Sequence, residues 1–209
     1  MLHFIHIIIF FSGSLTYAYV LPFVSFQRMS KLAATSVELE VEKAPYDDII
    51  PFLSEHVQPA DQMLFVGART DLSLQLSKNG YGTQNTGFIK VVDSNPNLIR
   101  SLHSMAQNDP ILRENIANNQ LSFVTADLTD MSEVCTQSVY DAIVDYKGLD
   151  ELLSDPTREE EEREMRFLAC IDHLQNSVRL GNILVSLSLL PKSKFCTPFD
   201  SRFGWVNEL

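Results

Sequence analysis

Gly67, Asp93 and Asp127 each close a short apolar run of the sequence, and their types suit the binding of a nucleoside. If the runs are parallel strands, these residues meet at the carboxyl edge of one sheet, where ligands of open α/β folds bind. A glycine there opens a loop that leads to a helix N-terminus. A carboxylate after the second run can accept hydrogen bonds from both ribose hydroxyls, and one after the third can meet an adenine amino group. The ordered set of three is more informative than any one residue.

Each residue alone also has an interpretation that needs no ligand. An Asp at the end of a strand is often a turn former or a helix cap. The run Asp93-Ser94-Asn95-Pro96 would then be only a capped helix start.

The elements that must position these residues alternate from residue 44 onward. Short apolar runs alternate with helix-like stretches, which is typical of parallel strands joined by crossover helices. The predicted strands cover residues 63–67, 87–93, 121–127, 140–146 and 181–190. We therefore expect an α/β fold with a parallel sheet.

Capping residues mark the helices between the first strands. Thr70 or Asp71 can cap a helix that ends at Gly80. Pro96 begins the next helix, whose apolar face includes Met105. A break at Asp109-Pro110 can start a further short helix.

A long helix is predicted after the fourth strand. Thr157 and Glu160 have the spacing of a capping box. The acidic run 159–162 then lies in the first turn, where the helix dipole favours carboxylates. The predicted buried stripe consists of Phe167, Cys170, Ile171, Leu174 and Val178.

Length and charge limit the kind of protein and partner. The chain has 209 residues and a net charge of −11, which suits one globular domain. Residues 1–36 contain two basic residues and no acid, so the rest carries 14 basic and 27 acidic residues, a net of −13. Such a domain is poorly suited to nucleic acid. A basic protein or a small molecule is the better partner, although the acids can also serve solubility alone.

The cysteines and histidines suggest no metal site and no disulfide framework. The three cysteines are odd in number and form no C-x-x-C pair. Cys170 falls on an apolar helix face and is interpreted as a core thiol. The five histidines are scattered along the chain.

The first 36 residues form an apolar leader, distinct from the domain at 37–209. Residues 4–11 are apolar and small residues follow up to Ala18, as in a secretory signal peptide. A marginal membrane anchor is the alternative if the leader stays uncleaved. Residues 19–36 lack acids and resemble a transit peptide, so the leader predicts import into an organelle such as a plastid. Translation from Met29 would instead give a cytoplasmic protein.

Residues 45–206 resemble the class I S-adenosylmethionine-dependent methyltransferases. Within them, the chain is similar to the branch that methylates lysines of translation elongation factors, of the methyltransferase-like 13 type. The segments that carry the resemblance are YDDIIPFLSEHVQPADQMLFVGA, GARTDLSLQLSKNGY, VVDSNPNLI, ADLTDMSEV and YDAIVDYKGLDELL. The resemblance implies a Rossmann-like sheet, S-adenosyl-L-methionine as cofactor and a protein lysine as acceptor.

The resemblance also implies roles for residues of the cofactor site. Gly67 matches the first glycine of the cofactor loop, and Arg69 stands near the second. Asp93 matches the ribose-binding acid, while Asp127 and Leu128 match the pair that contacts adenine.

The segment after the fourth strand implies a methyl-transfer pocket. Asp145 is the candidate catalytic residue, and Tyr146, Lys147 and Asp150 are candidates for the substrate pocket. The family's lysine and glycine are displaced by one position here.

Two departures from the family leave alternatives open. Arg69 either pairs outward with an acid, for which Asp71 is nearby, or fills the methionine subsite and blocks it. The sequence ends just after 203–206, which resembles the start of the family's sixth strand. The hairpin that completes the usual seven-stranded sheet is therefore expected to be lacking.

Three functions are compared on these grounds. The leading hypothesis is a methyltransferase that acts on a protein lysine. The second is a methyltransferase-like binding module without catalysis, favoured by Arg69 and the missing hairpin. A nicotinamide-dependent oxidoreductase is disfavoured, because the loop after the first strand lacks the G-x-G-x-x-G glycines.

Overall fold

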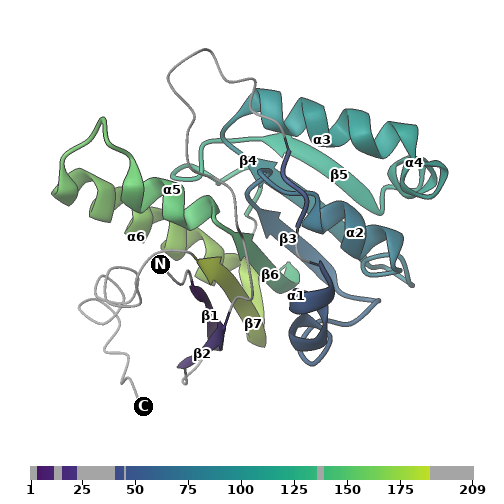
Figure 1. Ribbon diagram of the computed structural model, residues 1–209, viewed down its shortest axis with the longest axis horizontal. Coiled ribbons are helices and arrows are strands. Elements are labelled where there is room, and N and C mark those ends of the chain that lie inside the picture. The colour runs from purple at the N-terminus through teal and green to yellow at the C-terminus, as the bar shows by residue number, and fades with distance from the viewer. Residues whose placement is uncertain (1–3, 12–15, 23–40, 45, 136–138, 189–209) are drawn as a thin grey trace.

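The fold is known from a computed structural model, which describes residues 4–11, 16–22, 41–44, 46–135 and 139–188. Its centre is a seven-stranded sheet in the order β2-β1-β7-β6-β3-β4-β5 (Figure 1). The strands are β1 (Phe4–Phe11), β2 (Thr16–Pro22), β3 (Gln62–Val66), β4 (Phe88–Asp93), β5 (Leu121–Thr125), β6 (Tyr140–Tyr146) and β7 (Val178–Ser188). The five strands from β3 to β7 are parallel to their neighbours among themselves, as predicted.

Six helices are described. They are α1 (Tyr46–Leu53), α2 (Leu72–Lys78), α3 (Pro96–Asn108), α4 (Pro110–Ala117), α5 (Gly148–Ser154) and α6 (Glu160–Ser177). Among the described helices, none is both long enough and apolar enough to cross a membrane.

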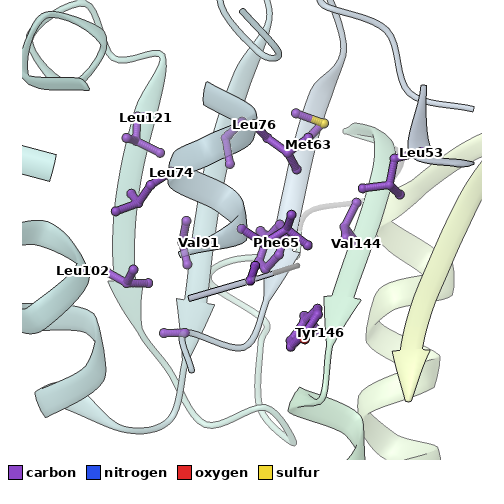
Figure 2. Packing of buried hydrophobic residues seen from close by; sticks show 14 of the residues in the cluster. Leu53, Met63, Phe65, Leu74, Leu76, Val91, Leu102, Leu121, Val144 and Tyr146 are labelled. Carbon is purple, nitrogen blue, oxygen red and sulfur yellow. The ribbon is translucent and has the colours of Figure 1, made fainter. Parts of the chain in front are cut away.

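Two apolar clusters cover the two faces of the sheet, because neighbouring residues of a strand point to opposite faces. Phe65 and Val91 pack with α1, α2, α3 and α4 on one face. Figure 2 shows both with Leu74 and Leu76 of α2 and Leu102 of α3. Leu64, Val66 and Val92 pack with α5 and α6 on the other. The sheet is therefore the middle layer of three, and its carboxyl edge is left to loops.

Most predicted helix starts are confirmed. Asn95 caps α3 by accepting a hydrogen bond from the Asn97 amide, with Pro96 in the first turn. Asp109 accepts from two amides of α4 and so ends one helix and starts the next. Asp71 precedes α2, although its carboxylate makes no capping bond there.

Two details of the predicted helices are wrong. Met105 is 41% exposed, since the buried face of α3 turns toward Leu102 and Ala106 instead. The capping box is also absent, because α6 begins only after Glu159 and the Thr157 hydroxyl donates to Asp155.

Other features of α6 agree with the sequence. Its first turn holds three glutamates, and Phe167, Cys170, Ile171 and Leu174 are buried. The last residue of the predicted stripe, Val178, is buried as well but begins β7.

A hairpin from the N-terminal end of the sequence completes the sheet. β1 lies antiparallel to β7, and β2 lies antiparallel to β1. Figure 1 shows this pair beside β7, far in sequence from its neighbour. The sheet edge beyond β7, which was expected to lack a hairpin, therefore carries β1 and β2. The residues of these two strands had been assigned to the leader. Residues 203–206 lie outside the described residues.

Candidate functional site

The candidate residues meet at the carboxyl edge of the sheet. Gly67 follows β3, while Asp93 is the last residue of β4. In the register of the parallel strands, Val66 is paired with both Val92 and Asp145. The predicted cofactor residues and the predicted catalytic residue thus stand on adjacent strands.

Gly67 makes the turn out of β3 possible. Its φ of +94° lies in the left-handed region that favours glycine. A Cβ there would lie 2.7 Å from the carbonyl oxygen of Tyr146 and 3.2 Å from the amide nitrogen of Gly148. The glycine is therefore needed for close packing of the β3 and β6 loops against each other.

Asp93 ties the glycine loop to β4. The residue is 2% exposed, and its carboxylate accepts hydrogen bonds from the Ala68 amide at 2.6 Å and the Asn95 amide at 2.7 Å. A carboxylate has about four acceptor positions, so two remain for ribose hydroxyls. Asp93 therefore organises the turn, and its role toward a ribose stays a prediction.

Arg69 pairs with an acid, but not with Asp71, the acid named from the sequence. Its guanidinium forms an ion pair with Glu151 of α5. Asp71 instead accepts from the Ala44 amide at 2.7 Å and from the Gln75 side chain at 2.9 Å. Burial lowers the pKa of Arg69, but the hydrogen bond to Glu151 together with the negative charges of Glu151, Asp93 and Glu42 outweighs this and leaves the pKa raised.

The segment 41–44, here called the strap, lies against the glycine loop. The Glu42 amide donates to the Arg69 carbonyl at 2.7 Å, and the Asp71 amide donates to the Glu42 carbonyl at 3.0 Å. The Glu42 carboxylate lies 3.5 Å from the Lys147 ammonium. The strap therefore links the loops that follow β3 and β6.

Two hydroxyls of the glycine loop and the helix after it have no described partner. The side chains of Thr70 and Ser73 are buried, and neither oxygen makes a hydrogen bond within the described residues. Leaving a buried hydroxyl unpaired costs about 1–3 kcal/mol. Both hydroxyls are therefore buried donors for which the described residues supply no acceptor.

Asp127 is exposed and forms a turn after β5. Its Oδ1 accepts from the amide and the hydroxyl of Thr129, at 2.9 and 2.8 Å, and lies 3.6 Å from Arg166. The Thr129 amide, together with the other donors, lowers the pKa of this carboxyl. Leu128, the other half of the predicted pair, is buried in the core beside Val66 and Val92.

Asp145 is fully buried at the end of β6. Its carboxyl accepts from the Ser186 hydroxyl at 2.6 Å and from the Leu149 amide at 3.0 Å. Burial and, to a lesser extent, the nearby Asp150 raise the pKa of Asp145 to about 8. The side chain therefore holds a proton at neutral pH and fastens the start of α5 to the sheet.

The three pocket candidates lie around Asp145. Asp150 is 7% exposed, and its Oδ1 accepts from the Ser188 hydroxyl at 2.5 Å. Lys147 adopts a left-handed φ of +61°, and its ammonium lies 5.2 Å from the centre of the Tyr146 ring. Burial raises the pKa of Tyr146 to about 12, with Glu42 and Asp71 adding to the effect.

Sequence reasoning missed four residues of this site: Glu42, Glu151, Ser186 and Ser188. The two serines had a detectable signal, because they are polar residues at alternate positions of an apolar strand and must share a face. Glu42 and Glu151 had none, since their roles depend on loops that only the fold brings together.

Comparisons with known proteins bear on the fold. No protein-family model matches the sequence, and no curated protein matches it either. The structure is similar to the CcbJ methyltransferase from Streptomyces caelestis, with 16% identity and a TM-score of 0.50 over 68% of this chain and 49% of that one.

Two structures of the glycopeptide N-methyltransferase MtfA are also similar. The complex with S-adenosyl-L-methionine has 11% identity and a TM-score of 0.49, over 74% of this chain and 59% of that one. The complex with S-adenosyl-L-homocysteine has 11% identity and a TM-score of 0.48, over 68% and 51%. The chain spans about half the length of the structures it matches.

Proposed function

We propose that this chain, which has the Rossmann-like fold of the class I methyltransferases, binds S-adenosyl-L-methionine and transfers its methyl group. The observation that carries the proposal is the placement of Asp93 at the carboxyl end of β4, beside the left-handed Gly67 and next to β5 with Asp127. That edge offers acceptors for ribose and adenine in the order in which the cofactor presents them.

The polar groups present fit the nucleoside half of this cofactor. Asp93 keeps acceptor positions after binding two amides, and Asp127 keeps one carboxylate oxygen beyond its turn. The unpaired hydroxyls of Thr70 and Ser73 supply donors at the same loop. The methionine half would meet Arg69, whose guanidinium can bind a carboxylate once it leaves Glu151.

For the acceptor we propose an amine, and specifically a protein lysine. Asp150 and Glu151 place carboxyl groups behind the β6 loop, which suits a cationic substrate. When bound, the cofactor supplies an electrophilic methyl group on a sulfonium. A lysine must first lose a proton. Asp145, whose pKa is about 8, can take up that proton only where its carboxyl is ionised, at a pH near or above 8.

The remaining contribution of the protein is alignment. Direct methyl transfer requires mainly that donor and acceptor are held in line and that water is excluded. Asp145 and Asp150, both buried and both held by serines of β7, are the rigid groups of the site. The ion pair of Lys147 with Glu42 holds the loop after β6 against the strap.

Calorimetric titration of the full chain with S-adenosyl-L-methionine tests the cofactor, with NAD as the control ligand. We expect binding of the first and none of the second. Binding of NAD alone would overturn the proposal in favour of the oxidoreductase. Transfer of labelled methyl from the cofactor to lysine-containing proteins, with free amines compared in parallel, tests the acceptor.

A second candidate function is a binding module without catalysis. It is favoured by the Arg69–Glu151 ion pair and by the strap, which together occupy the space beside the glycine loop. The two candidates differ in one measurable respect: a module that keeps this ion pair closed gives no heat with S-adenosyl-L-methionine.

A further inference from the structure

The hairpin β1–β2 pairs with the strand that holds the two aspartates of the candidate site. β1 runs antiparallel to β7, from Phe11 opposite Ile183 to His6 opposite Ser188. In this register Ile8 stands opposite Ser186. The two serines of β7 that donate to aspartates thus both have a strand partner in β1.

β7 pairs with β6 on one side and with β1 on the other, but the two pairings end at different residues of β7. β6 pairs with β7 up to Tyr146 opposite Leu187, and Asp145 stands opposite Ser186. Beyond that point, the register of Ser188 is given by β1 alone among the described strands. The strand end that carries the donor for Asp150 therefore depends on the hairpin.

A small displacement of β7 would disturb the hydrogen bonds from Ser186 and Ser188, because both serines are fully buried. The Ser186 hydroxyl lies 2.6 Å from Asp145 and the Ser188 hydroxyl 2.5 Å from Asp150. A strand edge without a partner exposes its amides and carbonyls to water and to other chains. Without β1, β7 would be the unpaired edge strand, and β7 carries the Ser186 and Ser188 hydroxyls.

We propose that the N-terminal hairpin stays on the folded protein and acts as a positioning element for Asp145 and Asp150 through Ser186 and Ser188. The idea that these aspartates serve methyl transfer rests on the proposed function, but the positioning itself does not. Cleavage after Ala18 would cut β2 inside its pairing with β1, and initiation at Met29 would omit both strands. Either event would leave a chain with a disturbed site.

Two altered proteins test this, each compared with the full chain. The first is a chain that begins at Met29. The second is full-length Ile8→Pro, in which proline removes a backbone donor opposite Ser186. Ile8→Val is its matched control, because it keeps the backbone donor and a β-branched side chain. The second protein keeps the test decisive if the shortened chain does not fold.

Hydrogen exchange and carboxyl titration are the measurements. In Ile8→Pro we expect the amides of residues 184–188 to exchange at least a hundredfold faster, with those of β3 and β4 unchanged. The ¹³C carboxyl signal of Asp145 reports the pKa of this residue, which should be near 8 in the full chain. In Ile8→Pro this pKa should fall by one unit or more, because water reaches the carboxyl. Ile8→Val should match the parent in both.

The results separate this inference from the proposed function. Unchanged exchange at 184–188 together with an unchanged Asp145 titration would overturn the positioning role. A natural protein whose intact mass begins after Ala18, with these amides still protected, would overturn retention. Neither measurement uses S-adenosyl-L-methionine, so a chain that fails to bind it can still confirm the hairpin.

Discussion

Asp93 is the side chain on which the proposed cofactor site depends most. Two charge-assisted hydrogen bonds to ribose hydroxyls contribute roughly 1.5–3 kcal/mol each. Asp93→Ala should therefore weaken binding of S-adenosyl-L-methionine by about a hundredfold or more, since each 1.4 kcal/mol is about tenfold. Asp127→Ala should cost less, because one hydrogen bond is at stake and this residue is exposed. Titration calorimetry measures both.

Two controls are needed for Asp93, because its carboxylate also holds the amides of Ala68 and Asn95. Asp93→Asn keeps one acceptor and should fall between parent and alanine variant in affinity. Thermal unfolding shows whether the loop survives. A folded Asp93→Ala protein with the parent's affinity would remove the main support for this site.

Arg69 decides between the catalytic and non-catalytic candidates. Because its guanidinium is held by Glu151, the cofactor carboxylate must compete with an internal partner. If Arg69 obstructs the loop, Arg69→Gly should gain at least tenfold in affinity for S-adenosyl-L-methionine. If it binds the carboxylate, the same change should lose affinity, and that is the outcome we expect.

Glu151→Gln is the matched variant for this prediction. It removes the charge that holds Arg69 and keeps the size of the side chain, so the guanidinium is released toward the ligand. We expect tighter binding than in the parent. Weaker binding would show that Glu151 itself contributes to the site, and calorimetry distinguishes the two.

The residues of this site were predictable where their chemistry follows from their place on a strand. Gly67, Asp93 and Asp127 were singled out because they close apolar runs, and parallel strands must bring such ends together. Asp145 was instead named from the resemblance of its segment to a methyltransferase motif. The ion-pair partner of Arg69 was not, since Asp71 is nearer in sequence but turns toward Ala44. Pairing across loops depends on packing, which a linear sequence does not show.

Among the elements, α4 gives a clear test of capping. Asp109 accepts from the amides of Ile111 and Leu112 and also pairs with Lys78. Removing a cap of this kind costs about 1 kcal/mol. Asp109→Ala should therefore lower the free energy of unfolding by about that amount, as measured in urea.

Thr157→Ala is the control for this loss. Its hydroxyl donates to Asp155 and caps no helix, so the change should leave the free energy of unfolding within about 0.5 kcal/mol. If Asp109→Ala loses no more unfolding free energy than Thr157→Ala, the amides capped by Asp109 are satisfied by water when the cap is removed.

Elements in the body of the domain were predicted more accurately than those at its edges. The five parallel strands agree with the structure to within a few residues, because each is a short apolar run of the sequence. The apolar run at 4–11 was instead interpreted as a signal peptide. An apolar segment of that length suits both a leader and a strand of a sheet. The structure pairs residues 4–11 with β7, and their role as a leader stays a prediction.

At the scale of the whole molecule, Asp145 couples stability to pH. Burial raises its pKa from the ordinary 3.8 to about 8, so the folded protein keeps a proton that the unfolded chain has lost. The contribution of the protonated Asp145 carboxyl to the free energy of unfolding is complete below pH 4 and is lost as the pH rises to 8. The free energy of unfolding should fall across this range by up to about 1.4 kcal/mol per unit.

Asp145→Asn should remove this slope and be more stable than the parent at pH 8. Asp130→Asn, an exposed change of the same charge, is the control and should keep the parent's slope. Denaturant unfolding at a series of pH values measures both. A parallel slope in the parent and Asp145→Asn would show that Asp145 is ionised in the folded protein.

The pairing of β1 with β7 also constrains how the protein is made. During synthesis the first strand leaves the ribosome long before its partner, because Ile8 and Ser186 are separated by nearly the whole described chain. Contacts between such distant segments form slowly. Although β2 can pair with β1 early, the edge of β1 that faces β7 must stay unpaired until β7 has been synthesised, which makes the nascent chain a natural client for a chaperone near the exit tunnel.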